Sequence, residues 1–427
     1  MKIEKTIIGE KGLVKLVGLV GLVMLGFPGC SSDDPQLQEQ TLAVEAMVSA
    51  PAFTDGMESS DEGRTVTRSW TPPTTPTRYY LYDDLYTDGG KTFADYVNYE
   101  SQNLSLNNKT IDVFFSISNE PDPLHCRLKY MPSAETHKWR LVLPSQVKEE
   151  AVSSGDYYIY GFIPREAADN AALTPNPTYD KGAVLTIEGM QTVSTDVCVI
   201  IGAKNGPDAD HDGGLTAGDF KFNLRAGYES LEPKVPYPNF MYLLFDHLCS
   251  ALKIRMRVYG DYDDVRTIKL KELRLQTATD EGTTKKKMNV TVTLKGNANG
   301  SDPIESVVYT PIGTELCDGL VYQNEEGATL TTDYSMFLCH FIPHGIKKLI
   351  LTSTYDVYDK NPSVGHPEGN LIRASCKATN TIDITKKIDR LAAVQRGYIY
   401  TLDLIVRPTY LYMLSEPDLD NPTIEVK

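Results

Sequence analysis

One acidic segment has the residue types and the spacing of a calcium-binding loop. Its aspartates stand at alternate positions and are followed by glycine, which permits the sharp turn that such loops make. Carboxylate oxygens placed in this way can surround a hard cation. The candidate ligands are Asp208, Asp210, Asp212 and Asp219. A structural calcium ion is one interpretation, and an acidic loop without metal, whose carboxylates stay solvated, is the other.

This loop is similar to those of EF-hand and dockerin modules, with two departures. Asp219 stands at the twelfth position, where glutamate is usual, and no convincing helices flank the segment. Because the segment lies in an inserted loop, we expect any calcium there to be structural, and no cofactor to be required.

Catalytic motifs are absent from the sequence. It contains neither G-x-S-x-G nor H-E-x-x-H, and Gly89–Thr92 lacks the first glycine of a phosphate loop. The seven histidines are not spaced as zinc pairs, and His247 is expected to pack or to form hydrogen bonds. We expect no enzymatic activity.

Composition narrows the class of partner. The 427 residues include 42 Lys and Arg against 57 Asp and Glu, which gives a formal net charge of −15. Because phosphate binding needs clustered basic residues, nucleic acid is not an expected partner. The hydrophobic fraction of 41% is enough for sizeable cores. The content of 25 Tyr, 31 Gly and 25 Pro favours short strands and turns.

The N-terminus has the pattern of a secretory signal, assigned to residues 1–29. Lysines precede the apolar run Leu16–Phe27, which is too short for a membrane-spanning helix of about 20 residues. Gly29 and Cys30 follow, and this resembles a bacterial lipoprotein signal, in which the cysteine is lipidated after cleavage. We expect palmitate on Cys30 and an outer-membrane lipoprotein; an ordinary signal peptide with a chance cysteine is the alternative.

Six further cysteines contain no C-x-x-C pair. Several lie in strand-like apolar runs, among them Cys198 and Cys339, and we expect these to be buried free thiols. The sequence does not choose among disulfide connectivities.

Alternation of apolar and polar residues predicts a mostly β chain. Apolar residues at every second position predict a first strand carrying Leu42, Val44, Ala46 and Val48. The clearest alternation lies in the second half, at Leu252–Val258, Val290–Leu294 and Tyr398–Val406. One apolar and one polar face is typical of antiparallel sandwiches. A region rich in Gly, Pro and Asp before Pro238 suggests a domain boundary, giving domains 65–237 and 238–427.

Several segments together resemble the fimbrillin family, the pilins of type V pili of Gram-negative anaerobes. The lipoprotein signal and first strand are followed by Glu62-Gly63-Arg64-Thr65. The other segments that carry the resemblance are Tyr157–Pro164, Phe245–Ile254 and Gly397–Leu402.

This resemblance implies two tandem β-sandwich domains of transthyretin-like or Greek-key type. It also implies that residues 30–64 are a propeptide, cut between Arg64 and Thr65 by an arginine-specific protease, with Arg68 as second choice. Loss of the first strand would open a groove with unpaired backbone groups, which a strand of another pilin subunit could fill. The implied protein is a subunit of a cell-surface fimbria, of shaft, tip or accessory type, that contributes to adhesion.

The tail 408–427 is the candidate donor strand. Its two short extended pieces carry Tyr410, Tyr412, Leu414, Ile424 and Val426. The alternative is a strand that closes its own domain.

A second function stays open: a surface lipoprotein that binds glycan or host protein and never polymerises. Its candidate aromatic platforms are Trp70, Trp139 and the pair Tyr79–Tyr80.

Overall fold

The fold is given by a computed structural model, which divides the chain into residues 1–40 and 41–427. Only parts of the second unit are described, and among them no helix is long and apolar enough to cross a membrane. The described residues are 41–42, 44–50, 52–55, 93–99, 104, 109–132, 139–147, 152–205, 217–224, 239–297, 301–360, 369–386, 394–407 and 423–426.

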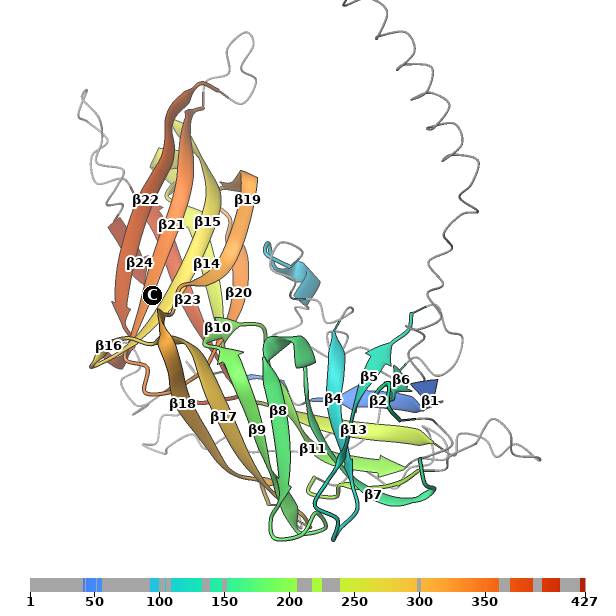
Figure 1. Cartoon of the computed structure of the whole chain (residues 1–427). Coiled ribbons are helices and arrows are strands. Elements are labelled where there is room, and N and C mark those ends of the chain that lie inside the picture. Colours follow the sequence, from blue (N-terminus) through green and yellow to red (C-terminus); the bar gives the residue numbers. More distant parts are fainter. Residues whose placement is uncertain are drawn as a thin grey trace, which may run out of the picture. The chain divides into compact units, whose positions relative to one another are not determined.

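The largest sheet has nine strands (Figure 1). The hydrogen-bonded order is β1-β6-β5-β4-β7-β11-β13-β2, and β12 also pairs with β7. Its central strands β7 and β11 are apolar on both faces and are largely buried. The strands are β1 (Thr41–Leu42), β2 (Glu45–Ser49), β4 (Thr110–Ser116), β5 (Leu124–Tyr130), β6 (Trp139–Val142), β7 (Gly155–Ile163), β11 (Cys198–Asn205), β12 (Lys221–Leu224) and β13 (Phe240–His247).

A four-stranded sheet covers this large sheet and completes the first sandwich. Its order is β18-β17-β9-β8, with β8 (Asn170–Pro175), β9 (Gly182–Gln191), β17 (Lys285–Lys295) and β18 (Ile304–Leu316). Alternate residues of β9 and β17, such as Leu185 and Val292, join one hydrophobic core with residues of the nine-stranded sheet, such as Phe245.

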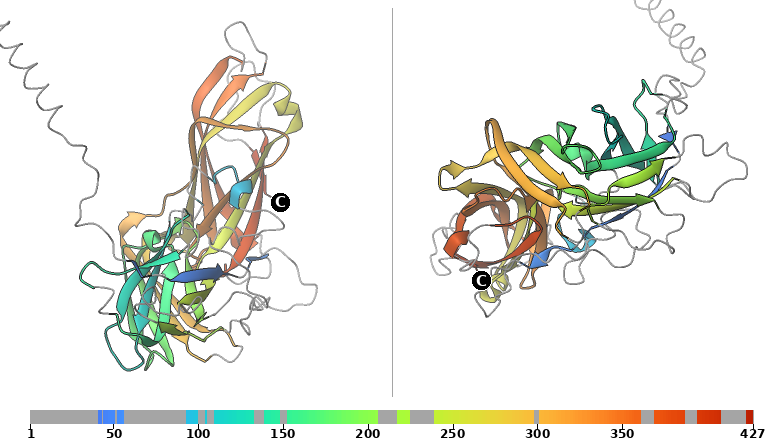
Figure 2. Two further views of the ribbon diagram at one scale, coloured as in Figure 1. Left: turned by 90° about the vertical axis from the view of Figure 1, so that its right-hand side faces the viewer. Right: turned by 90° about the horizontal axis from the view of Figure 1, so that it is seen from below.

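The second sandwich has its own core between two further sheets. The six-stranded sheet has the order β10-β20-β14-β23-β24, with β3 also on β23. It contains β3 (Thr54–Asp55), β10 (Val193–Ser194), β14 (Ser250–Val258), β20 (Ser335–Phe341), β23 (Tyr398–Arg407) and β24 (Thr423–Val426). The five-stranded sheet contains β15 (Arg266–Thr279), β16 (Gly282–Thr283), β19 (Gly319–Leu330), β21 (Lys348–Asp359) and β22 (Leu371–Asp383). Figure 2 shows these mainly orange and red strands wrapped around a common interior.

Helical structure in the described residues is limited to single turns. These are η1 (Phe93–Asp95), η3 (Arg165–Ala167), α2 (Gly260–Asp263) and η5 (Ile384–Lys386). The expectation of a mostly β fold is confirmed.

The domain boundary expected between residues 237 and 238 does not separate the two cores. Strand β13 pairs with β11 in the nine-stranded sheet, and β17 pairs with β9 in the four-stranded sheet. Residues from the second half of the chain therefore complete the first sandwich. The sequence could not reveal this, because alternation marks which face of a strand is buried and not which strand it pairs with.

Candidate functional site

The described residues among 41–55, which we call the leader segment, form both edge strands of the nine-stranded sheet, one beside β6 and the other beside β13. Strand β1 pairs antiparallel with β6, where Leu42 lies opposite Leu141. Strand β2 pairs in parallel with β13, where Ala46 lies opposite Met241. Without these two strands, β6 and β13 would be open edges with unpaired backbone groups.

The apolar residues of the leader segment are part of the first core. Val44 and Ala46 are fully buried, and Val48 is 1% exposed. These are three of the four residues that the sequence assigns to a removable strand. For the fourth, Leu42, the structure describes the backbone pairing.

Beyond β2, the leader segment also reaches the second sandwich. Strand β3 pairs in parallel with the beginning of β23, where Thr54 lies opposite Tyr398. The backbone N–H of Thr54 donates to the carbonyl of Gly397 at 2.9 Å. Because β14 occupies the other side of β23, β3 lies on its outer edge.

The C-terminal strand β24 pairs with the far end of that same outer edge. Val406 of β23 lies opposite Ile424, and Leu404 lies opposite Val426. In this structure Thr423–Val426 therefore closes its own domain, as in the alternative interpretation of the tail. One edge of β23 thus holds the leader at its beginning and the tail at its end.

Other predicted site residues lie outside the described part of the chain. They are Cys30, Arg64, Thr65, Arg68, Tyr410, Tyr412, Leu414, Asp208, Asp210 and Asp212. Arg64 follows the last described leader residue, Asp55, by 64 − 55 = 9 positions. A cut there would place the whole leader segment on the released fragment.

Phe53 connects the leader segment to buried histidines. Its ring stacks on the imidazole of His247, with centroids 3.8 Å apart and an interplanar angle of 25°. The imidazole of His340 lies 5.7 Å from the same ring. Both histidines are 1% exposed, and burial lowers the pKa of His340 to about 4.

Beneath Phe53, three side chains converge; we call Asp196, Cys198 and His247 the junction cluster. His247 Nδ1 lies 2.7 Å from Asp196 Oδ2 and 3.3 Å from Cys198 Sγ. Cys198 Sγ lies 3.3 Å from that same carboxylate oxygen. All three residues are at most 1% exposed.

This geometry differs from that of a catalytic triad. In a triad the nucleophile and the acid contact opposite ring nitrogens of the histidine. Here the thiol and the carboxylate both contact Nδ1 of His247, so three ligand atoms surround one point. Such convergence is the arrangement of a metal site or of a compact hydrogen-bonded cluster.

No pattern in the sequence predicts the junction cluster. His247 forms a hydrogen bond, as the sequence predicts, and Cys198 is a buried free thiol, also as predicted. Asp196 belongs to no motif that would predict its place in the cluster. His247 lies 51 positions from Asp196, so only the pairing of β11 with β13 brings them together.

Charged and thiol groups surround this cluster. Arg396 donates from Nη1 to Asp246 Oδ2 at 2.7 Å, and its Nη2 lies 3.2 Å from Asp302. Burial, and then the charge of Asp196, raises the pKa of the Cys249 thiol well above its usual range. All six described cysteines are buried and free, as expected for Cys198 and Cys339.

Of the predicted calcium ligands, the structure describes Asp219. Its carboxylate accepts a hydrogen bond from the backbone N–H of Lys221 at 3.2 Å, at the start of β12. Its backbone carbonyl accepts from Ala203 at 2.7 Å. Calcium binding stays a prediction.

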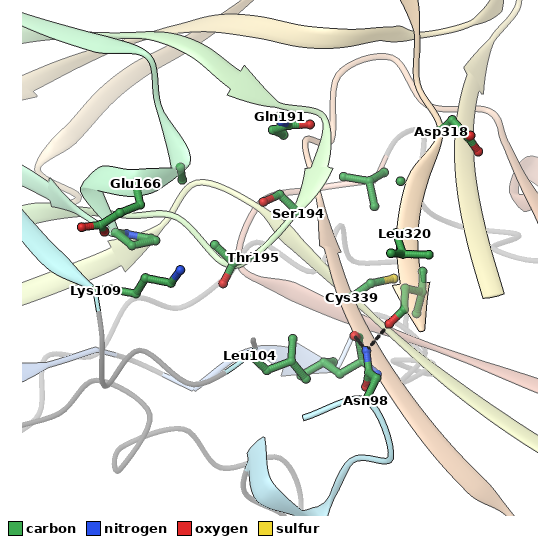
Figure 3. A pocket seen from close by; sticks show the side chains of 16 residues that line it. Asn98, Leu104, Lys109, Glu166, Gln191, Ser194, Thr195, Asp318, Leu320 and Cys339 are labelled. Atoms are coloured by element: carbon green, nitrogen blue, oxygen red, sulfur yellow. Dashed lines mark hydrogen bonds between the residues drawn. The ribbon is translucent and has the colours of Figure 1, made fainter. Parts of the chain in front are cut away.

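A pocket of about 350 Å³ lies where β10, β19 and β20 approach η3 (Figure 3). Lys109, Glu166 and Asp318 contribute charged groups to its lining. On its floor, the buried Asn98 amide donates to the carbonyls of Val321 and Leu338, both at 2.7 Å.

One aromatic platform suggested for glycan binding is excluded. Trp139 is fully buried and packs edge-on against Tyr130. A large apolar ring on an inward-facing strand position serves the core, and alternation did not reveal which face of β6 is covered. Trp70 and the pair Tyr79–Tyr80 lie outside the described residues.

Comparison with known proteins gives structural neighbours only. No protein-family model and no curated protein matches the chain. It is similar to a candidate cell adhesion protein from Bacteroides fragilis, with 9% identity, TM-score 0.38 and coverage of 90% of this chain and 97% of that one. It is also similar to a fimbrial protein from Bacteroides vulgatus, with 12% identity, TM-score 0.30 and coverage of 77% of this chain and 94% of that one. The third similar structure is the fimbrial anchor protein Mfa2 from Porphyromonas gingivalis, with 10% identity, TM-score 0.24 and coverage of 74% of this chain and 87% of that one.

Because the TM-scores lie between 0.24 and 0.38, the function proposed next rests on this chain's own residues and contacts.

Proposed function

We propose that this chain is the precursor of a cell-surface fimbrial subunit that contributes to adhesion. In this proposal it is exported as an outer-membrane lipoprotein with palmitate on Cys30, and a protease then cuts after Arg64. The subunit joins others by strand exchange as a shaft, tip or accessory pilin. The observation that carries the proposal is that the leader segment fills the gap between β6 and β13.

Loss of the leader segment would leave the first sandwich open. The sites of Val44, Ala46 and Val48 would lose their apolar cover, and each buried Val contributes about 1.5–3 kcal/mol. Phe240–Leu244 of β13 would lose its strand neighbour on one side and keep β11 on the other. An open edge beside an apolar groove binds an added strand well, because both backbone and side chains find partners.

The tail of another subunit is the proposed occupant of this groove. Thr423–Val426 pairs with only four residues of β23 in its own chain, and short edge strands are the first to detach. Strand addition in trans would link subunits head to tail. Tyr410, Tyr412 and Leu414 would extend the donor beyond Ile424 and Val426.

The test is limited proteolysis of the purified full-length chain with an arginine-specific protease. We expect N-terminal sequencing to find Thr65 first and size-exclusion chromatography to find polymers. The variant Arg64→Ala, alone and with Arg68→Ala, should stay intact and monomeric. A chain cut after Arg64 that remains monomeric with its leader segment released would contradict assembly by strand exchange.

The alternative is a surface lipoprotein that binds glycan or host protein without polymerising. The polar pocket beside Lys109 and Glu166 is the feature that favours it. A glycan array with wild-type protein and Arg64→Ala separates the two functions, because a binder is indifferent to that change. We propose no enzymatic activity and no required cofactor, with calcium as an optional structural ion.

A further inference from the structure

The junction cluster has ligand atoms of the types that a zinc-class ion prefers. It offers one thiol sulfur, one imidazole nitrogen and one carboxylate oxygen, from Cys198, His247 and Asp196. Borderline-soft divalent ions favour such mixed sets, whereas calcium and magnesium require oxygen ligands. The cluster is separate from the acidic loop near Asp219.

The distances among these atoms are close to those around a tetrahedral ion. Zinc lies about 2.0–2.3 Å from such ligands, which places tetrahedral ligand atoms roughly 3.3–3.6 Å apart. The sulfur lies 3.3 Å from both the oxygen and the nitrogen. The nitrogen–oxygen distance of 2.7 Å is a hydrogen bond, and it would open by about 0.6 Å around an ion.

Charge balance also suits a divalent ion. With a thiolate, a carboxylate and a neutral imidazole, a divalent cation gives a complex of zero net charge. A neutral complex is the form that a site with at most 1% exposure tolerates, because burying net charge is costly. On binding, Cys198 would release its thiol proton to solvent, and the imidazole of His247 would carry its proton on Nε2.

His340 is the second observation that points to a ligand. It is 1% exposed, and neither ring nitrogen has a hydrogen-bond partner within the described part of the chain. Its ring lies 5.7 Å from the ring of Phe53, which also stacks on His247. A buried imidazole without partners needs an explanation, and coordination of a bound ion by one of its nitrogens would supply it.

Phe53 covers one face of the His247 ring. It stacks directly on His247, is itself only partly buried, and belongs to the leader segment. Release of the leader segment would therefore uncover the face of the His247 ring. Cleavage would then change the chemistry at the junction as well as opening the groove for a donor strand.

We propose that Asp196, Cys198 and His247, with His340 beside them, form a site for a zinc-class divalent ion that the leader residue Phe53 keeps closed in the precursor. The gating part rests on the proposed function, since it assumes that the leader segment is released.

Cobalt(II) is a suitable probe, because a thiolate ligand gives it an intense sulfur-to-metal charge-transfer absorption. The experiment uses the full chain as the intact precursor, the protease-cut form, and Phe53→Ala, which removes the cover without any cut. We expect the absorption within minutes in the cut form and in Phe53→Ala, and at least tenfold more slowly in the intact precursor. Zinc should displace the cobalt.

Control variants test the metal site and its closure by Phe53 separately. Cys198→Ser should abolish the absorption, whereas Cys376→Ser, a change at a buried cysteine in the other sandwich core, should leave it unchanged. Absence of the absorption in both opened forms, or its survival in Cys198→Ser, would overturn the site. Equal rates in intact and Phe53→Ala protein would overturn the gate. Phe53→Ala requires neither cleavage nor polymers, so this result is independent of the fimbrial proposal.

Discussion

The ring of Phe53 stacks on the imidazole of His247 at a centroid distance of 3.8 Å. One residue lies in the leader segment, and the other ends strand β13. This contact, together with the pairing of β2 on β13 and of β3 on β23, attaches the leader to both sandwiches. Release of the leader would therefore affect both sandwiches at once.

The buried valines of the leader segment should stabilise the precursor. We expect Val44→Ala and Val48→Ala each to lower the free energy of unfolding by about 1.5–3 kcal/mol, because each leaves a cavity in the first core. Urea unfolding of the full chain measures this. The matched control is Val308→Ala, at a position that is 54% exposed, where a change within about 0.5 kcal/mol is expected. Equal effects at all three positions would count against a leader strand packed in the core.

The Asn98 side chain should hold together the edges of β19 and β20. Its amide donates to Val321 and Leu338, and its oxygen accepts from the N–H of Leu338 at 3.0 Å. Asn98→Ala leaves these buried backbone groups unpaired, so we expect a loss of about 3 kcal/mol in thermal or urea unfolding. Asn170→Ala, which removes an exposed side chain, should cost less than about 0.5 kcal/mol. A similar cost for both variants would argue against this role.

The free energy of unfolding should fall at high pH because the buried Cys126 thiol has a raised pKa in the folded chain. Burial, and then the charge of Asp112, raises the pKa of this thiol to about 12 in the folded chain, against 9.0 as its ordinary value. Between these values the unfolded chain loses a proton that the folded chain keeps, so rising pH favours unfolding. We expect this group to contribute a loss of about 3 kcal/mol by about pH 11.

The variant Cys126→Ala isolates this contribution from other groups that titrate at high pH. The difference in unfolding free energy between wild type and variant should shrink as the pH rises above 9. A difference that stays constant with pH would show that the thiol titrates alike in both states.

The acidic loop gives a prediction about calcium. Isothermal titration at millimolar calcium should show heat that is lost when Asp210 and Asp212 are both changed to Asn. Asp302→Asn, outside the loop, is the control. No heat from the wild-type chain would leave the segment as a solvated acidic loop.

The sequence alone determined that the chain is mostly strand and that the leader segment buries apolar side chains. Alternation correctly predicted that Val44, Ala46 and Val48 are buried, because a period of two places these side chains on one face. The single strand expected there is instead two, β1 and β2, which pair with different strands, and Val44 lies between them. The apolar runs around Cys198 and Cys339 likewise indicated buried thiols, since those strands are covered on both faces.

Only the tertiary structure decided which strands pair and which side chains meet. It placed β17 on β9 across the expected domain boundary, and it brought Asp196 to His247 across 51 positions. The physical reason is that periodicity is a local property, fixed by backbone geometry within a few residues. Pairing between distant strands depends instead on how whole surfaces fit together, and no short stretch of sequence contains that information.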